Sequence, residues 1–120
     1  MSNASYGFSR RTQFEYTINV LATERNVEKT FTQLQPWSRH IVDINNTSAD
    51  VDITVTGYAV VELSNGRTID VEVFTQKVGF GNDEVLKDWG YMVTGRLKII
   101  VLCDKDPTAA FDVEIIMLEV

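Results

Sequence analysis

Residues 50–63 read DVDITVTGYAVVEL, the clearest alternation in the chain. Every second residue from Val51 to Leu63 is apolar or glycine. Side chains alternate between the two faces of a strand, so this period of two predicts a β-strand with one buried face. Such a strand would span roughly 46 Å, whereas a compact domain of this size is roughly 35 Å across. We therefore expect either a bend at Gly57, which is favoured, or a hairpin that projects from the body.

The turn that follows this strand can be derived from its register. An Asn-Gly pair is typical of a two-residue hairpin turn, but here that register would pair Val61 with Asp70 and bring acidic side chains to the core face. A three-residue loop over 64–66 pairs Val61 with Ile69 instead and keeps apolar side chains together. It also places Gly66 in the left-handed conformation of a bulge, which glycine adopts readily. We expect the three-residue loop.

Alternation predicts the remaining strands over 13–22, 67–76, 91–103 and 111–120, with a short one over 39–44. On the strand over 67–76, the residues expected on the apolar face are Ile69, Val71 and Val73.

One helix is expected after the first strand. Thr23 is a suitable N-cap, and Val27, Phe31 and Leu34 follow at helical spacing until Pro36 ends the pattern. These residues predict a short amphipathic helix over 24–35.

The stretch over 77–90 is expected to be a long connection. Asn82 could cap a short helix within it.

These elements describe a mainly β protein on the border of the α+β class. We expect an antiparallel sheet of five to six strands, sandwich- or barrel-like, with the one helix against it. Residues 1–12 show no periodicity and are expected to form an extended N-terminal arm. Residues 13–120 are expected to form a single β-rich domain.

Composition excludes several classes of protein. The 120 residues include 11 Lys and Arg against 17 Asp and Glu, a net charge of −6, which counts against a dedicated nucleic-acid binder. No apolar run reaches about 18 residues and no signal core begins the chain, so we expect no membrane contact and a location in the cytoplasm or a virion. The single cysteine, Cys103, excludes an intramolecular disulfide.

Catalytic motifs are scarce. The one histidine, His40, could form a triad with Asp43 and Ser38, but no nucleophile elbow of the G-x-S-x-G kind is present. Cys103 precedes Asp104, whose charge would raise the pKa of the thiol. The glycines at 79 and 81 lack the third glycine of a dinucleotide-binding turn. We expect no catalytic site, no cofactor and no enzymatic activity.

Two acidic pairs are candidate metal ligands. Asp104-x-Asp106 and Asp50-x-Asp52 lack the third ligand, the central glycine and the terminal glutamate of a calcium loop, so we expect no metal site. A third acidic pair, at positions 70 and 72, is expected beside Tyr58 and Lys98 on an open sheet face, where the charges favour solubility.

An apolar second face is the most informative feature. The last two strands carry apolar residues on both faces over part of their length, so something must cover the second face. The arm adds two aromatic and two basic residues. The interface candidates are Tyr6, Phe8, Arg10, Arg11, Tyr58, Val60, Phe74, Ile100, Leu102, Ile116, Leu118 and Val120.

These features predict a non-enzymatic structural or interaction protein. We expect an oligomeric small component of a larger assembly, virion- or tail-like by loose analogy, whose partner is protein and first of all another copy of itself. One alternative is an acidic inhibitor or sequestering protein that binds a partner protein. Another is a small-ligand-binding β domain with a cavity lined by Tyr16, Trp37, Tyr58 or Trp89.

Overall fold

The computed structural model describes residues 13–32, 38–92 and 94–119, with the backbone alone for Ser38 and residues 87–92. Within these ranges the chain forms eight β-strands and no helix. The strands are β1 (Gln13–Val20), β2 (Asn26–Phe31), β3 (Ser38–Asn46), β4 (Ile53–Glu62), β5 (Thr68–Val78), β6 (Asp83–Met92), β7 (Leu97–Cys103) and β8 (Phe111–Glu119). The mainly β, antiparallel character expected from the sequence is confirmed.

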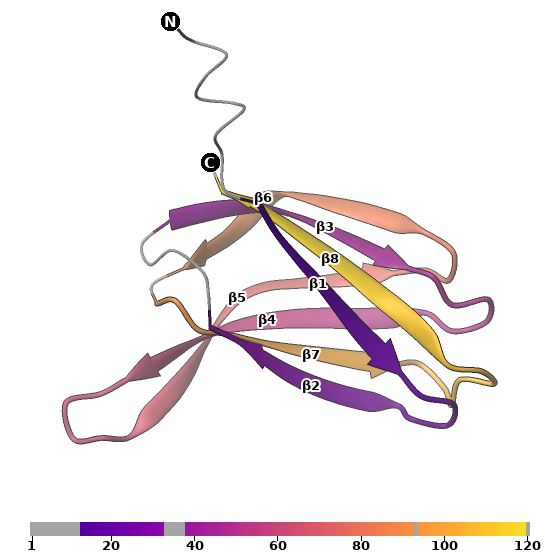
Figure 1. The fold of residues 1–120 in the computed structure, drawn as a ribbon, viewed down its shortest axis with the longest axis horizontal. Helices are drawn as coiled ribbons and strands as arrows, with labels where there is room; N and C mark the ends of the chain where they lie inside the picture. Colours follow the sequence, from indigo (N-terminus) through magenta and orange to yellow (C-terminus); the bar gives the residue numbers. More distant parts are fainter. Residues whose placement is uncertain (1–12, 33–37, 93, 120) are drawn as a thin grey trace, which may run out of the picture.

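The strands form two four-stranded sheets that pack face to face (Figure 1). Sheet A has the order β1-β8-β3-β6 and sheet B the order β2-β7-β4-β5, with every neighbouring pair antiparallel. The chain crosses from one sheet to the other at each connection except the β4–β5 hairpin. This arrangement is a jelly roll, so the sandwich among the expected architectures is the one observed, with eight strands in place of five to six.

The core lies between the inner faces of the two sheets, and alternation predicted many of its members. The four residues expected on the core face of the last strand, Phe111, Val113, Ile115 and Met117, are all buried. On β4 the inward residues Ile53 and Val55 are buried in the same cluster. Burial of these apolar faces supplies the main driving force for joining the two sheets.

The predicted hairpin register is confirmed. Val61 pairs with Ile69, and the N–H of Leu63 donates to the carbonyl oxygen of Arg67 at 2.7 Å across the three-residue loop. Gly66 has a φ of 87°, the left-handed conformation that the loop requires.

This hairpin projects from the sandwich. β4 pairs with β7 only as far as Ala59, but it pairs with β5 as far as Glu62. The tip therefore extends past the rest of sheet B, at the lower left of Figure 1. The projecting hairpin, the less favoured of the two expectations, is therefore correct. The β4–β5 ladder also shifts register between Gly57 and Tyr58, where the bend was expected.

The expected helix over 24–35 is wrong, because β2 occupies part of it. Residues four apart share a face in a strand as well as in a helix, so Val27 and Phe31 satisfy both patterns. Thr23 is no N-cap: its φ of 68° places it in the turn between β1 and β2, where its N–H donates to the carbonyl of Pro107 at 2.9 Å. Leu34 lies outside the described residues.

The expected long connection over 77–90 is also wrong. The N–H of Asn82 donates to the carbonyl oxygen of Gly79 at 3.0 Å, and Gly81 has a φ of 70°. These residues form a tight turn that leads directly into β6, so Asn82 caps no helix.

The expected strand over 91–103 is divided between the end of β6 in sheet A and β7 in sheet B. Alternation alone does not reveal such a change of sheet, because inward residues of both sheets face the same core and are apolar in both.

A register shift in β5 changes the direction expected for Phe74, whereas Ile69 and Val71 keep the expected core-facing side and Val73 packs partly buried against the core. Gly57 pairs with Phe74 and Tyr58 with Glu72, so Val73 is an extra residue in β5. Such a bulge reverses the alternation beyond it. Phe74 is consequently buried, whereas Ile69 on the projecting hairpin is 41% exposed.

Substitution of Gly57 should test this packing. A Cβ at Gly57 would overlap the ring of Phe74, including its Cζ at 2.6 Å. We expect Gly57→Ala to lower the free energy of unfolding by about 1 to 3 kcal/mol, as over-packing does elsewhere, measured by urea denaturation. In a Phe74→Leu background the loss should be smaller; losses that add to within about 0.5 kcal/mol would contradict the contact.

Candidate interaction surfaces

His40 and Asp43, two members of the triad considered from the sequence, lie on opposite faces of sheet A, and the side chain of Ser38 lies outside the described residues. His40 is fully buried on the inner face of β3, with its ring centroid 6.0 Å from that of Phe14. Burial lowers the pKa of the imidazole and thus favours its neutral form. Asp43, three residues along the strand, pairs with Ile116 on the outer face of sheet A, so the two side chains lie on opposite faces.

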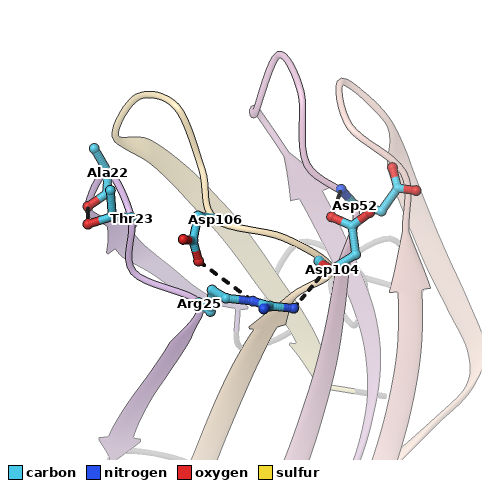
Figure 2. Close-up of polar contacts among 6 residues, drawn as sticks. All are labelled: Ala22, Thr23, Arg25, Asp52, Asp104 and Asp106. Atoms are coloured by element: carbon cyan, nitrogen blue, oxygen red, sulfur yellow. Dashed lines mark hydrogen bonds and ion pairs between the residues drawn. The ribbon is translucent and has the colours of Figure 1, made fainter.

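The aspartates weighed as metal ligands hold loops together at one end of the sandwich. Asp104 accepts a hydrogen bond from the N–H of Asp52 at 3.1 Å, and Asp52 accepts one from the N–H of Phe80 at 3.0 Å. Arg25 donates to the carbonyl oxygen of Asp104 at 2.9 Å and lies 3.8 Å from the carboxylate of Asp106 (Figure 2). The described ranges contain no group of three or more His, Cys, Asp or Glu placed to hold a metal.

Asp50 has the same role. Its carboxylate accepts hydrogen bonds from the N–H and the hydroxyl of Thr108, at 3.3 and 2.9 Å. The hydrogen bond from the Thr108 hydroxyl is the largest cause that lowers the pKa of Asp50. Since these bonds favour the charged form, the carboxylate acts as a fixed acceptor that ties two loops together.

Cys103 lies on the core face of β7 and is 1% exposed, as the alternation predicted. Burial raises the pKa of its thiol, and the neighbouring charge of Asp104 raises it further. A buried, protonated thiol behaves as a small hydrophobic side chain.

The apolar second face expected on the last two strands is divided between opposite sides of the sandwich. Ile100 and Leu102 point outward from sheet B, because their neighbours Ile99 and Val101 point into the core. Ile116 and Leu118 point outward from sheet A. The single patch expected from the sequence is therefore wrong: β7 and β8 follow one another in the chain but belong to different sheets.

Two of the interface candidates are buried. Phe74 is 6% exposed and Val60 is 7% exposed. The bulge at Val73 turns Phe74 inward. Val60 lies under the β6–β7 connection, where its N–H donates to the carbonyl oxygen of Arg96 at 3.1 Å and its carbonyl accepts from the hydroxyl of Thr94 at 2.9 Å.

The polar cluster expected on sheet B is present. The Lys98 ammonium forms an ion pair with Asp70 and lies 5.6 Å from the centroid of the Tyr58 ring. Lys98 pairs directly with Tyr58 across β7 and β4. The Lys98 ammonium of the same chain therefore already covers part of the Tyr58 ring.

Five interface candidates lie outside the described residues. They are Tyr6, Phe8, Arg10, Arg11 and Val120.

The structure instead exposes an apolar side of the β4–β5 hairpin, which was expected in the core. We call it the hairpin surface: Val61, Leu63, Ile69 and Val71. Ile69 and Val71 are each 41% exposed, and Val61 and Leu63 are half-buried. The length of the strand over 50–63 was the signal that could have found this surface.

A second surface is the outer face of sheet A. It is defined by apolar residues at its centre and carboxylates around them. The members are Ile41, Val85, Ile116 and Leu118, with Glu15, Asp43, Asp83, Asp112 and Glu114, and with Arg39 at one end.

Within this outer face Asp43 is an unusual carboxyl group. Its strand neighbours are Ile116 on one side and Val85 on the other. Burial raises the pKa of Asp43 to about 6, and the nearby carboxyl group of Asp83 raises it as well. The face thus places an acid in apolar surroundings, where its charged form is disfavoured.

Grooves run along the side where the edge strands β1 and β2 lie. Two hollows of about 330 and 390 Å³ are lined there by residues of these strands and of the turn between them, Tyr16 and Val27 among them. The rings of Tyr16 and Phe31 stack beside them with centroids 3.9 Å apart. Trp37 and Trp89 were also expected to line a ligand cavity, and their side chains lie outside the described part of the structure.

No protein-family model and no curated protein matches the sequence. Among solved structures, the Yersinia pseudotuberculosis-derived mitogen matches with a TM-score of 0.52 at 7% identity, covering 90% of this chain and 86% of that one. A chain of the IBDV T13 viral particle matches with a TM-score of 0.48 at 13% identity, covering 92% of this chain and 31% of that one. The likeness to the mitogen shows a shared fold. In the part of the chain that the structure describes, no helix is long and apolar enough to cross a membrane.

The raised pKa of Asp43 predicts a pH-dependent effect of Asp43→Asn. The folded-state pKa of about 6 lies above the ordinary value of 3.8. The contribution of the Asp43 carboxyl group to the free energy of unfolding is therefore fully present below pH 4 and is lost as pH rises through 6. Asparagine stays neutral, so we expect Asp43→Asn to raise Tm by about 2 to 5 °C at pH 8 and to change it little at pH 4. Thermal unfolding followed by circular dichroism checks this.

Asp112→Asn is the matched control, because this carboxylate lies on the same face and accepts a hydrogen bond from Asn19 at 3.0 Å. It should not raise Tm at pH 8. An equal change for Asp43→Asn at both pH values would contradict the assignment.

Proposed function

We propose that this chain is a non-enzymatic structural or interaction protein, which associates with other protein chains and first of all with copies of itself as a small component of a larger assembly. The observation that carries the proposal is the hairpin surface, an apolar face that continues beyond the sandwich.

The hairpin surface continues the core-facing side of β4. Ala59, at the edge of the sandwich, is buried and pairs with Val71; one step outward, Val61 pairs with Ile69. These pairs keep the inward orientation of Ile53 and Val55, yet Ile69 and Val71 are 41% exposed. Contiguous apolar surface of this kind marks interaction sites in proteins that are otherwise well packed.

The opposite side of the hairpin is polar. Glu62, Asp70 and Glu72 lie there, and Asp70 is held by Lys98. The hairpin is therefore amphipathic, with one side suited to solvent and the other to an apolar partner surface. Among the described strands β5 pairs with β4 alone, which makes it an edge strand of this sheet, and an edge strand can add a further strand from a partner.

The jelly-roll fold supports this proposal without selecting it. Jelly rolls occur in virus capsids, lectins and cupins, and a fold alone does not decide between such functions. The virion- or tail-like assembly stays a proposal by analogy, whereas association through an exposed apolar hairpin rests on named side chains.

Ile69→Asp should weaken assembly while leaving the fold intact. Ile69 is 41% exposed, so a carboxylate there costs little in the isolated chain, but it would have to be desolvated at an interface. We expect association to weaken at least about tenfold, with Tm within a few degrees of the wild type. Light scattering on size-separated protein at several concentrations measures the change.

Thr68→Asp is the matched control, because it adds the same charge on the adjacent, exposed position of the opposite side. It should leave assembly unchanged. A wild-type chain that is monomeric at high concentration, or an Ile69→Asp chain that assembles like the wild type, would contradict the proposed role of the hairpin.

A further inference from the structure

We propose that His40 makes one end of the sandwich acid-sensitive: when its imidazole takes up a proton from solvent, the beginning of β1 separates from the core. This inference goes beyond the proposed function and does not depend on it, because the response belongs to the single chain.

The imidazole of His40 is buried without hydrogen-bond partners. The residue is 0% exposed, and neither Nδ1 nor Nε2 has a hydrogen-bond partner among the residues that the structure describes. A neutral imidazole carries one donor and one acceptor, whereas the imidazolium carries two donors and a full charge. Burial of that charge without partners is far more costly than burial of the neutral ring. The closed sandwich therefore accepts the neutral ring and disfavours the protonated one.

Part of the cover over this ring comes from β1. In sheet A, β8 lies between β1 and β3, yet the ring of Phe14 reaches across β8 until its centroid is 6.0 Å from that of His40. Phe14 is the second residue of β1 and is half-buried. Tyr16, the next inward residue of the strand, stacks on Phe31 of β2. The beginning of β1 therefore closes this end of the core over the histidine.

Few titratable groups of sheet A face the ring. On β8 Glu119 is the cross-strand neighbour of His40 and follows the inward alternation of that strand. On β6 the neighbour is Gly90, which has no side chain. On β1 the titratable inward side chain described is Tyr16, and burial raises the pKa of its hydroxyl above the ordinary value of 10.0. In acid, Glu119 is thus the one described charge of this sheet on the same side as the ring.

The described part of sheet B adds no charge against the ring. Lys29 lines the groove at the exposed edge, and Arg96 is exposed in the connection before β7. Cys103 lies at the opposite end of the sandwich, beside the loops that the aspartates hold together. The Glu119 carboxylate does not offset burial, because the pKa of the imidazole is lowered and burial is the cause.

The packing around His40 is interrupted on both sides. Among the described strands β1 pairs with β8 alone, and Phe14 lies next to its first residue, so this segment can separate without breaking the β3–β8 ladder. On the other side of β3, the ladder with β6 shifts register between His40 and Val42. Opening of a segment held by few contacts requires less free energy than global unfolding. The beginning of β1 is therefore the segment expected to open.

The sign of the pH effect follows from these surroundings. When β1 opens, water reaches the ring, and its pKa returns toward the ordinary value of 6.5; in the closed sandwich the pKa is lower. The stability that the neutral ring gives to the closed state is therefore fully present above pH 6.5 and is lost as the pH falls from 6.5 toward the closed-state pKa. Since one proton is bound, the opening equilibrium increases by at most about tenfold per pH unit.

Hydrogen exchange on the full-length chain tests the inference. Between pH 6.5 and pH 5, protection of the β1 amides near Phe14, corrected for intrinsic exchange, should fall by up to about tenfold per pH unit. Amides of the β3–β8 ladder should keep their protection. In His40→Phe, which keeps a ring but cannot titrate, the β1 protection should not change with pH. Asp43 titrates on the outer face in both chains, so their comparison removes its contribution.

Glu119→Gln is the matched control, because it neutralises the carboxylate beside the ring and leaves the imidazole in place. Its β1 protection should still fall with pH. Since the chain contains one histidine, the NMR signal of the imidazole reports on His40 directly, and this measurement on the wild type needs no variant to fold. The inference is overturned if His40 titrates at about pH 6.5 while β1 stays protected, if His40→Phe keeps the pH dependence, or if Glu119→Gln abolishes it.

Discussion

The rest of the structure depends on the burial of two inner sheet faces against each other. Residues such as Ile18, Ile44, Ile99 and Ile115, two from each half of the chain, are fully buried in one cluster. Because the chain crosses between the sheets at almost every connection, neither sheet can bury its face before the other is formed. The same constraint decides which side chains are left outward, and it places the outward residues of β7 and β8 on opposite sides of the molecule.

Alternation in the sequence predicted the elements whose neighbours are local. The register of the β4–β5 hairpin depends on residues that are close in sequence, on either side of one three-residue loop, so Val61 and Ile69 could be paired correctly. β2 was mistaken for a helix because Val27 and Phe31 satisfy both periods, and β6 was mistaken for a connection. Both strands pair with distant partners, Val27 with Val101 and Asp83 with Asn45, and no local pattern records such pairing.

The candidate surfaces also combine features that one strand determines, which could be predicted, with features that strand order determines, which could not. The outward direction of Ile100, Leu102, Ile116 and Leu118 could be predicted, because it depends only on alternation within one strand. Whether these side chains meet depends on strand order, which the crossings of a jelly roll separate from chain order. For Phe74 even the direction failed, since the one extra residue at Val73 reverses the face of all that follows.

The hairpin surface follows from the same constraint. β4 pairs with β7 only as far as Ala59, and beyond this point β5 alone accompanies it among the described strands. The apolar side of the two strands keeps the orientation that it has inside the core, yet Ile69 and Val71 are each 41% exposed. A pattern of alternation that buries side chains within the sandwich therefore produces an exposed apolar surface where the sheet narrows to two strands.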